Sequence, residues 1–399
     1  MKILTVNKFL FKKGGSETYI LKLGEQLKNM GCEVQYFGME HQGNCVFNNA
    51  GQYTSDMDFH TASPLKKISY SLKTVYSKEA KTKIKTVLKD FEPDVVHLNN
   101  FNYQLTPSII LGIKEFEKEC GKKIKTVYTA HDYQLICPNH MLYTNNEICE
   151  KCTHGNFGEC LKNKCIHGST AKSLMGTIEA KYWDKRSVYE NIDTVICPTE
   201  FMKTKLETNP VFRGKTVVLH NFIDNEPTTD KNAKTNQKDD YVLYFGRFDE
   251  EKGVKLFDGL SDINLVCAGA GNLEDFINSL PNVKNVGFKT GEELNELIKN
   301  AVCTIYPSIW YENCPFSVME SINSGTPVVG ANIGGIPELI KNGENGFLFE
   351  PGNKKDLALK VKMILNNKNL AREMSENCFN TKFNNVREYA EKLIEIYTK

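Results

Sequence analysis

The sequence predicts an α/β protein with two Rossmann-like domains whose parallel β-sheets face each other across a cleft. Short, almost continuously apolar runs alternate with helical patterns along the whole 399-residue chain. Such runs are typical of strands that are covered on both faces, as in parallel sheets. A single polar stretch near the middle interrupts the alternation, and the chain is long enough for two separate cores.

The first half begins with the apolar run ILTV, which predicts a strand at 3–6, and continues with a glycine pair. A helix is expected from Ser16, whose side chain would cap it, to Gly31, which would close it. Further strands are predicted at 33–37, 94–98, 124–130, 193–198 and 215–220. We therefore expect residues 1–222 to form an N-terminal domain.

The second half follows a polar stretch at 225–240, whose composition is typical of a linker or an exposed loop. Strands are then predicted at 241–246, 263–271, 283–288, 302–307 and 326–331. These elements indicate a C-terminal domain over 223–380. The run VREYAEKLIEIY predicts a last helix, and we expect segment 381–399 to pack back on the N-terminal domain.

The composition is that of an ordinary soluble protein, with 40% hydrophobic and 25% charged residues. A net charge of +1 argues against a nucleic-acid-binding protein. No apolar run is long enough to span a membrane, and the start MKILTVNKFLFKKGG is too short and too charged for a signal peptide. We therefore expect a cytoplasmic location.

Two carboxylates flank a predicted helix start in YENCPFSVMESINSG, at Glu312 and Glu320. Pro315 suits the first turn of that helix, and the free N–H groups of 316–318 would attract a phosphate. Carboxylates are poor phosphate ligands but good acceptors for sugar hydroxyls. The pattern therefore predicts a phosphorylated sugar ligand, although on spacing alone two solvated glutamates would explain it equally well.

Two cations follow a predicted strand in YFGRFDEEKGVKLF, at Arg247 and Lys252. If the ligand is a phosphorylated sugar, these two cations would neutralise the negative charge of a diphosphate leaving group. The alternative is a solvated loop in which Asp249, Glu250 and Glu251 are the ionic partners.

Small or polar residues also follow strands in the first half. Gly14 and Gly15 come directly before a helix, where the backbone can approach a ligand closely. In TVYTAHDYQ, His131 ends a predicted strand, and Asp132 would orient it or cap the next turn. Ligands of doubly wound sheets bind beyond the carboxyl ends of the strands, so the cleft between the two halves is the expected site.

The stretch PSIWYENCPFSVMESINSGTPVVGANIGGIPELIKNGENGFLFEPGN resembles the C-terminal signature of the family-four retaining glycosyltransferases, also called glycosyltransferase group 1, which have the GT-B fold. Glu312 and Glu320 match the E-x7-E element of that family. Arg247 and Lys252 match its G-R-x4-K-G pattern. The usual glycine-rich filling of the E-x7-E element is replaced here by Asn313, Cys314 and Pro315, which looks like the trait of a subgroup.

The resemblance implies a role for each matching residue toward a nucleotide-sugar donor, with UDP or GDP as the nucleotide. Arg247 and Lys252 would bind the diphosphate, Glu320 the ribose, and Glu312 the hydroxyls of the transferred sugar. The helix start would supply further donor contacts from Cys314, Pro315, Phe316 and Ser317.

In the N-terminal half the resemblance places Gly14 and Gly15 against the donor sugar and phosphate. His131 would contact the transferred sugar, with its backbone carbonyl near the anomeric carbon. The implied activity is retaining transfer of a hexosyl group to an acceptor hydroxyl, with no metal ion at the diphosphate. The pathway would be polysaccharide or glycolipid assembly.

Other classes of protein share this fold. One alternative is a sugar-nucleotide epimerase or a phosphorylase, against which the two glutamates and two cations together argue. A second alternative is a non-catalytic protein that binds sugar nucleotides, or a zinc-dependent interaction protein that uses a cysteine-rich segment as its surface.

That cysteine-rich segment covers about 137–165 and begins six residues after His131. The spacing of Cys149 and Cys152 is typical of a zinc knuckle, which Cys160 and Cys165 could complete as a structural site. The remaining candidate ligands are Cys137, His140, His154 and His167. Free thiols and disulfides are the alternatives. In each case the segment would wall the acceptor side.

A basic segment, Lys66–Lys89, carries eight lysines and one glutamate. Its apolar residues form a stripe at Leu65, Ile68, Leu72, Val75 and Tyr76. Basic amphipathic helices of this kind lie on anionic lipid, so peripheral contact with the inner face of a membrane is one interpretation. A solvated helix face is the other.

Overall fold

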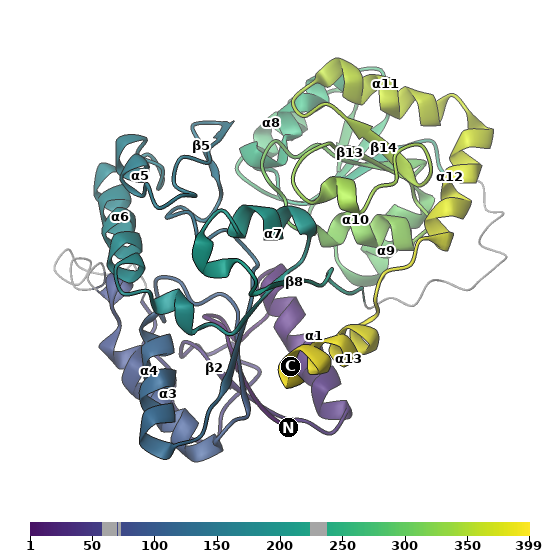
Figure 1. Ribbon diagram of the computed structural model, residues 1–399. Coiled ribbons are helices and arrows are strands. Elements are labelled where there is room, and N and C mark those ends of the chain that lie inside the picture. Colours follow the sequence, from purple (N-terminus) through teal and green to yellow (C-terminus); the bar gives the residue numbers. More distant parts are fainter. Residues whose placement is uncertain (58–69, 71–72, 224–237) are drawn as a thin grey trace.

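A computed structural model describes residues 1–57, 70, 73–223 and 238–399, and it confirms the predicted fold class. The described part contains two six-stranded parallel sheets, one in each half, flanked by helices (Figure 1). Their strand orders are β2-β1-β3-β4-β7-β8 and β11-β10-β9-β12-β13-β14. In both sheets the order reverses beside the first strand of the half, and this is where ligands of doubly wound sheets bind.

The strands of the N-terminal sheet match the predicted apolar runs. They are β1 (Lys2–Val6), β2 (Glu33–Phe37), β3 (Val95–Leu98), β4 (Lys125–Thr129), β7 (Thr194–Cys197) and β8 (Thr216–Val218). The helices of this half that matter below are α1 (Gly15–Asn29), α3 (Lys78–Phe91), α4 (Ser108–Cys120), α6 (Thr170–Asp184) and α7 (Glu200–Leu206). The cysteine-rich segment adds a short hairpin, β5 (Tyr143–Thr144) and β6 (Glu147–Ile148), and helix α5 (Gly158–Lys162).

The C-terminal sheet contains the five predicted strands and one that the apolar pattern missed. They are β9 (Val242–Phe245), β10 (Leu265–Ala268), β11 (Val283–Asn285), β12 (Cys303–Tyr306), β13 (Val328–Ala331) and the unpredicted β14 (Gly346–Phe349). The helices of this half are α8 (Glu274–Ser279), α9 (Gly291–Asn300), α10 (Phe316–Asn323), α11 (Lys354–Leu365) and α12 (Lys368–Asn380). Strand β14 is short and begins at a glycine, which hides it in the sequence.

The expected cap of the first helix is wrong. Helix α1 begins at Gly15 with Gly14 as its N-cap, and no side chain caps it. Ser16 lies inside the first turn, where its hydroxyl donates to Glu17 and accepts from Asn100 of the loop after β3. The start of α1 therefore presents bare backbone to its surroundings.

The two halves have separate cores, and the last helix joins the first half. One core cluster is drawn from residues 4–212 and another from residues 223–378. Helix α13 (Val386–Thr398) packs beside α1, and its Tyr389 shares a hydrogen bond with Tyr19 (Figure 1). These contacts support, as a proposal, domains over 1–222 and 223–380 with 381–399 returning to the first.

The predicted linker lies mostly outside the described residues, which resume at Lys238. That ammonium is buried and donates to the carbonyls of Ala301 and Gly325 and to the hydroxyl of Thr326. Burial lowers the pKa of Lys238 to about 8. The end of the polar stretch is therefore anchored in the C-terminal core.

Candidate functional site

A cavity of about 370 Å³ opens at the carboxyl ends of the C-terminal strands. It is lined by Tyr244, Phe245, Gly246, Arg247, Lys252, Ala268, Ala270, Phe288, Lys289, Leu294, Tyr306, Phe316, Ser317 and Glu320. Its walls come from the loops after β9, β10, β11 and β12 and from the start of α10. The cavity thus collects five of the residues that the sequence pointed to: Arg247, Lys252, Phe316, Ser317 and Glu320.

Helix α10 begins at the floor of this cavity. Pro315 is its N-cap, with φ near −68°, and no side chain caps the free N–H groups of the first turn. A Cβ added to Gly15 would lie 3.5 Å from the Phe316 ring, so the starts of α1 and α10 face each other across the two halves. Two helix N-termini converge here, which favours an anionic ligand.

Arg247 and Lys252 are both paired with carboxylates of their own half. Arg247 pairs with Asp249 and, at 2.8 Å, with Glu251. The Lys252 ammonium lies 2.6 Å from Glu312 Oε1. The Arg247 side chain is 60% exposed, whereas that of Lys252 is 15% exposed, so the two pairs differ in how far water screens them.

Glu312 is buried beneath the cavity rather than open to it. Its Oε1 accepts from the Ser308 hydroxyl at 2.6 Å and from the Trp310 indole N–H at 2.7 Å, in addition to Lys252. Burial alone would raise the pKa of this carboxyl, but the charge of Lys252 and the three hydrogen bonds lower it overall. Glu312 is therefore ionised and held in place.

Glu320 lies on α10 beside the cavity, one turn after Ser317. Burial raises the pKa of its carboxyl above the ordinary value, and nearby Lys22 of α1 opposes that shift in part. Cys314, the remaining residue of the expected helix start, is buried, and its backbone carbonyl accepts from the Asn221 side chain. Its thiol therefore faces the core and not the cavity.

His131 follows β4 and faces α1 and the loop that carries Glu312. Its ring Nε2 lies 2.9 Å from Asn99 Oδ1, and its backbone carbonyl accepts from the Asn313 side chain at 2.7 Å. Because an amide oxygen only accepts, Nε2 carries the proton and Nδ1 is the free acceptor. Burial lowers the pKa of His131 to about 4, which keeps the ring neutral at pH 7.

Asp132 takes the second of its two expected roles. Its Oδ1 accepts from the backbone N–H of Gln134 at 2.9 Å, so it caps the turn that follows. The ring of His131 is instead fixed by Asn99. No sequence pattern pointed to Asn99 or Asn313 as partners of His131, because both residues lie far from it along the chain.

Phe288 is the other site residue that the sequence did not reveal. It follows β11 at the rim of the cavity and is 74% exposed, an unusual state for so large an apolar side chain. Lys289 lies beside it on the same rim. An exposed aromatic ring next to a cation suits the flat face of a nucleobase.

The four cysteines proposed for zinc do not form a metal site in this structure. Among the described residues, which include all thirteen cysteines, no group of three or more His, Cys, Asp or Glu side chains is placed to hold a metal ion. All thirteen are free thiols. Cys160 and Cys165 share a hydrogen bond that raises the pKa of the Cys160 thiol and lowers that of Cys165. The arrangement agrees with the free-thiol alternative.

The fold is that of a two-domain α/β protein, and its cavity offers cations, a carboxylate and an exposed aromatic ring. Comparison with known proteins defines the class of protein. Residues 13–227 match Glycosyltransferase Family 4, and residues 225–381 match Glycosyl transferases group 1. Since the first match covers more than half of the chain, this protein belongs to Glycosyltransferase Family 4. It is a glycosyltransferase with the GT-B fold.

Relatives by sequence include an uncharacterized glycosyltransferase of Methanocaldococcus jannaschii, 29% identical over 240 residues. That alignment covers 56% of this chain and 66% of the relative, just under two thirds of its length. The N-acetyl-alpha-D-glucosaminyl L-malate synthase of Bacillus anthracis is 23% identical over 398 residues, which cover 96% of this chain and 92% of that protein.

Solved structures support the fold. Sucrose-phosphate synthase from Thermosynechococcus elongatus superposes with a TM-score of 0.69 at 18% identity, covering 100% of this chain and 98% of that one. Anabaena HepE in complex with UDP gives a TM-score of 0.66 at 16% identity, covering 100% of both chains.

Proposed function

We propose that this glycosyltransferase transfers a hexosyl group from a UDP- or GDP-sugar to an acceptor hydroxyl, with retention at the anomeric carbon. The observation that carries the proposal is the cavity of about 370 Å³, which combines two cations, the start of α10 and a carboxylate. Its size matches a nucleotide diphosphate, and the related Anabaena HepE has been crystallised with UDP and with UDP-glucose.

In this proposal the nucleobase stacks on Phe288 and the ribose hydroxyls donate to Glu320. The diphosphate lies between Arg247 and the first amides of α10, with Lys252 at the phosphate that leaves. Both cations are already paired with carboxylates. When the donor binds, its phosphates therefore replace these carboxylates as partners of the cations or share the cations with them. Such a pre-arranged site needs little reorganisation during the reaction.

The transferred sugar then lies between Glu312 and His131. The neutral His131 ring offers Nδ1 as an acceptor for a sugar hydroxyl, while Asn99 fixes its tautomer. For retention, the acceptor oxygen attacks the face from which the diphosphate departs, and the departing phosphate takes the acceptor's proton. Arg247, Lys252 and the α10 amides stabilise the charge that develops there, so no metal ion is required at the diphosphate.

A binding screen followed by turnover tests this function. Thermal-shift measurements against UDP, GDP, ADP and their sugars should raise the melting temperature for one nucleotide family. The matching sugar donor should then be turned over in the presence of EDTA. Phosphate-dependent release of a sugar phosphate would identify a phosphorylase, and stabilisation without turnover for any acceptor would favour a binding protein.

We also propose that the enzyme meets a lipid-linked acceptor at an anionic membrane surface, through the lysines of α3. Among the described helices, none is long and apolar enough to cross a membrane. The apolar face of α3 is not free to insert, since Ile84, Val87 and Leu88 are fully buried in the core. Contact through α3 must therefore be electrostatic.

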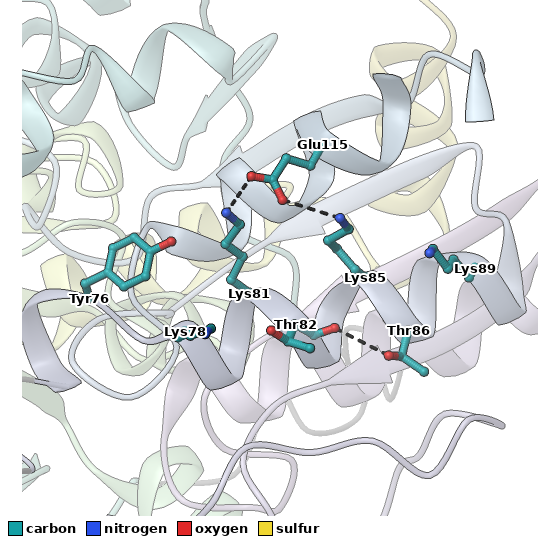
Figure 2. A pocket seen from close by; sticks show the side chains of 8 residues that line it. All are labelled: Tyr76, Lys78, Lys81, Thr82, Lys85, Thr86, Lys89 and Glu115. Carbon is teal, nitrogen blue, oxygen red and sulfur yellow. Dashed lines mark hydrogen bonds and ion pairs between the residues drawn. The ribbon is translucent and has the colours of Figure 1, made fainter. Parts of the chain in front are cut away.

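Figure 2 shows the surface in question, a groove of about 410 Å³ between α3 and α4. Its lining is Tyr76, Lys78, Lys81, Thr82, Lys85, Thr86, Lys89 and Glu115. Lys81 and Lys85 pair with Glu115, and Lys85 and Lys89 pair with Glu119. The four lysines of the lining therefore outnumber these two glutamates, and the groove carries net positive charge. Residues 65, 68 and 72 of the expected apolar stripe lie outside the described residues. Tyr76 is half-buried and stacks on Trp183 at the end of the groove.

Liposome flotation with and without anionic lipid tests this contact. Wild-type protein should float with anionic vesicles and lose that property at high salt. Replacing Lys78 and Lys89 by glutamine should reduce recovery, whereas the same change at Lys355 and Lys360 of α11 should not. Equal recovery of all three proteins on neutral and anionic vesicles would reject the proposal.

A further inference from the structure

The cysteine-rich segment reaches the loop that carries Glu312. Glu150 lies between Cys149 and Cys152, in the turn after hairpin β5–β6. Its Oε1 accepts from the Tyr311 hydroxyl and from the Lys205 ammonium, each at 2.6 Å. Tyr311 belongs to the C-terminal half and directly precedes Glu312. A side chain of the segment is thus one hydrogen bond away from the donor-site loop.

Aromatic and cationic groups surround this contact. Lys205 lies 5.1 Å from the ring centroids of both Phe201 and Tyr311, and those two rings meet edge to face at 4.7 Å. Burial alone would raise the pKa of the Glu150 carboxyl, but the hydrogen bonds from Lys205 and Tyr311 lower it overall. Glu150 therefore accepts as a charged group, which makes both hydrogen bonds strong.

The segment itself is anchored to the N-terminal half near Glu150. The Thr153 hydroxyl donates to the backbone carbonyl of Glu150, and the Thr208 hydroxyl donates to the carbonyl of Thr153. Thr208 follows α7, the helix that carries Lys205. The turn at Glu150 is therefore held by Lys205 of α7 through the Glu150 side chain and by Thr208, just after α7, through the Thr153 carbonyl. It can act as a fixed support.

The loop of Glu312 depends on such support from the N-terminal half on both sides. Tyr311 is held by Glu150, and Asn313 donates to the His131 carbonyl. Among the described residues, the partners of the Glu312 side chain all belong to its own half: Lys252, Ser308 and Trp310. The two neighbours of Glu312, together with the Cys314 carbonyl that accepts from Asn221, therefore tie this loop to the other domain.

We propose that Glu150 is a positioning residue that acts through Tyr311, so that the cysteine-rich segment sets the geometry of the donor-sugar pocket. This inference rests on the proposed role of Glu312 toward the transferred sugar. It gives the segment a task within the transferase reaction, without a metal and without a separate partner. The nucleotide itself binds on the far side of Glu312, at Arg247 and Glu320, and should not depend on Glu150.

Kinetics on four variants test the inference. Tyr311→Phe removes only the hydroxyl, whereas Glu150→Ala removes the carboxylate with its methylene and also breaks the ion pair with Lys205. Each should lower kcat about tenfold, the scale of one coupled contact. The double variant should be no slower than either single one, and Glu150→Gln should recover part of the rate. Affinity for UDP or GDP alone should stay at the wild-type value. Glu159→Ala is the matched control, because this glutamate of α5 interacts with Lys162 and Asn163 of its own helix end and with Lys151, not with the loop of Glu312.

A second measurement does not depend on activity. Amide hydrogen exchange of residues 308–316 should be faster in Tyr311→Phe and Glu150→Ala than in the wild type or Glu159→Ala. Unchanged exchange there, unchanged kcat, or additive losses in the double variant would overturn the inference. A wild-type protein that turns over no nucleotide sugar would instead reject the proposed function, and the exchange data would still decide whether Glu150 positions this loop.

Discussion

The two halves of the molecule line the proposed site with different chemistry. The C-terminal half presents full charges in close pairs, such as Lys252 with Glu312 at 2.6 Å. The N-terminal half presents neutral groups: His131 is bound to Asn99, and burial lowers the pKa of the ring to about 4. Under the proposed function, the charged pairs of the C-terminal half handle the diphosphate, and the transferred sugar is held between the ionised Glu312 of that half and the neutral His131 of the other.

The contrast extends into the interior behind each half. His97, behind the N-terminal part of the site, bonds Thr129 through Nε2 and Tyr397 of α13 through Nδ1, each at 2.7 Å. Burial and the nearby His131 lower the pKa of His97 to about 3. Behind the C-terminal part, buried Glu312 is instead kept ionised by Lys252. Burial therefore keeps His97 neutral, whereas a buried cationic partner keeps Glu312 ionised.

The largest expected effect concerns the charged half. Lys252→Ala should lower kcat by on the order of 10²–10³, because the leaving phosphate loses a fixed cation. Steady-state kinetics with the identified donor measures this. Lys255→Ala, which removes a lysine of the same loop that pairs only with Glu250, is the control and should keep the wild-type rate. A near-wild-type kcat for Lys252→Ala would contradict the assignment.

Removal of Glu312 should be felt in stability as well as in activity. Glu312→Ala leaves the Lys252 ammonium largely buried without its carboxylate, and breaking such a pair costs roughly 3 kcal/mol of unfolding free energy. Urea denaturation gives the value. The exposed pair Arg387–Glu391 of α13 offers a comparison, since Glu391→Ala should cost less than about 1 kcal/mol. Equal losses of unfolding free energy at the two sites would show that the buried Lys252–Glu312 pair stabilises the fold no more than an exposed pair does.

The neutral half should make folding sensitive to acid. With a folded pKa near 3 against an ordinary 6.5, His97 binds a proton in the unfolded chain before it does so in the folded one. The contribution of His97 to the free energy of unfolding is complete above pH 6.5. It falls by about 1.4 kcal/mol per pH unit between that value and pH 3. Unfolding curves of the wild type and His97→Gln between pH 7 and 5 should therefore diverge in slope. Parallel dependences would contradict a buried neutral His97.

The smallest effect is expected at the rim. Phe288→Ala should weaken nucleotide binding by less than about tenfold, through lost stacking, and should leave the melting temperature unchanged because the ring is 74% exposed. Isothermal titration with the nucleotide provides the affinity. Phe47→Ala, at a second exposed phenylalanine in the other half, is the matched control. Identical affinities for all three proteins would remove Phe288 from the site.

The sequence predicted the C-terminal side of the site better than the N-terminal side, for a physical reason. Arg247 with Lys252, and Glu312 with Glu320, are separated by few residues, and strand-to-helix loops bring such neighbours to one edge of a sheet. The ion pair between Lys252 and Glu312 was not visible in the sequence, since these residues are sixty positions apart. Apart from β14, the strands of the two large sheets were equally accessible, because most of them are short, buried apolar runs.

The missed features depend on contacts between distant parts of the chain. Asn99 meets His131 across two strands, Tyr311 meets Glu150 across two halves, and Tyr397 meets His97 from the last helix. No periodicity or spacing encodes such pairs. The misplaced cap at Ser16 has a local cause, because the glycine pair that precedes it can itself begin the helix. Cysteine spacing likewise suggested a zinc site, which the described residues do not form.

A crystal structure with the nucleotide sugar that stabilises the protein most would test the central claim directly. The account predicts the diphosphate within hydrogen-bonding distance of Arg247 and the first amides of α10, with the sugar between Glu312 and His131. A donor bound elsewhere, with Arg247 and Lys252 still paired only to their carboxylates, would contradict it.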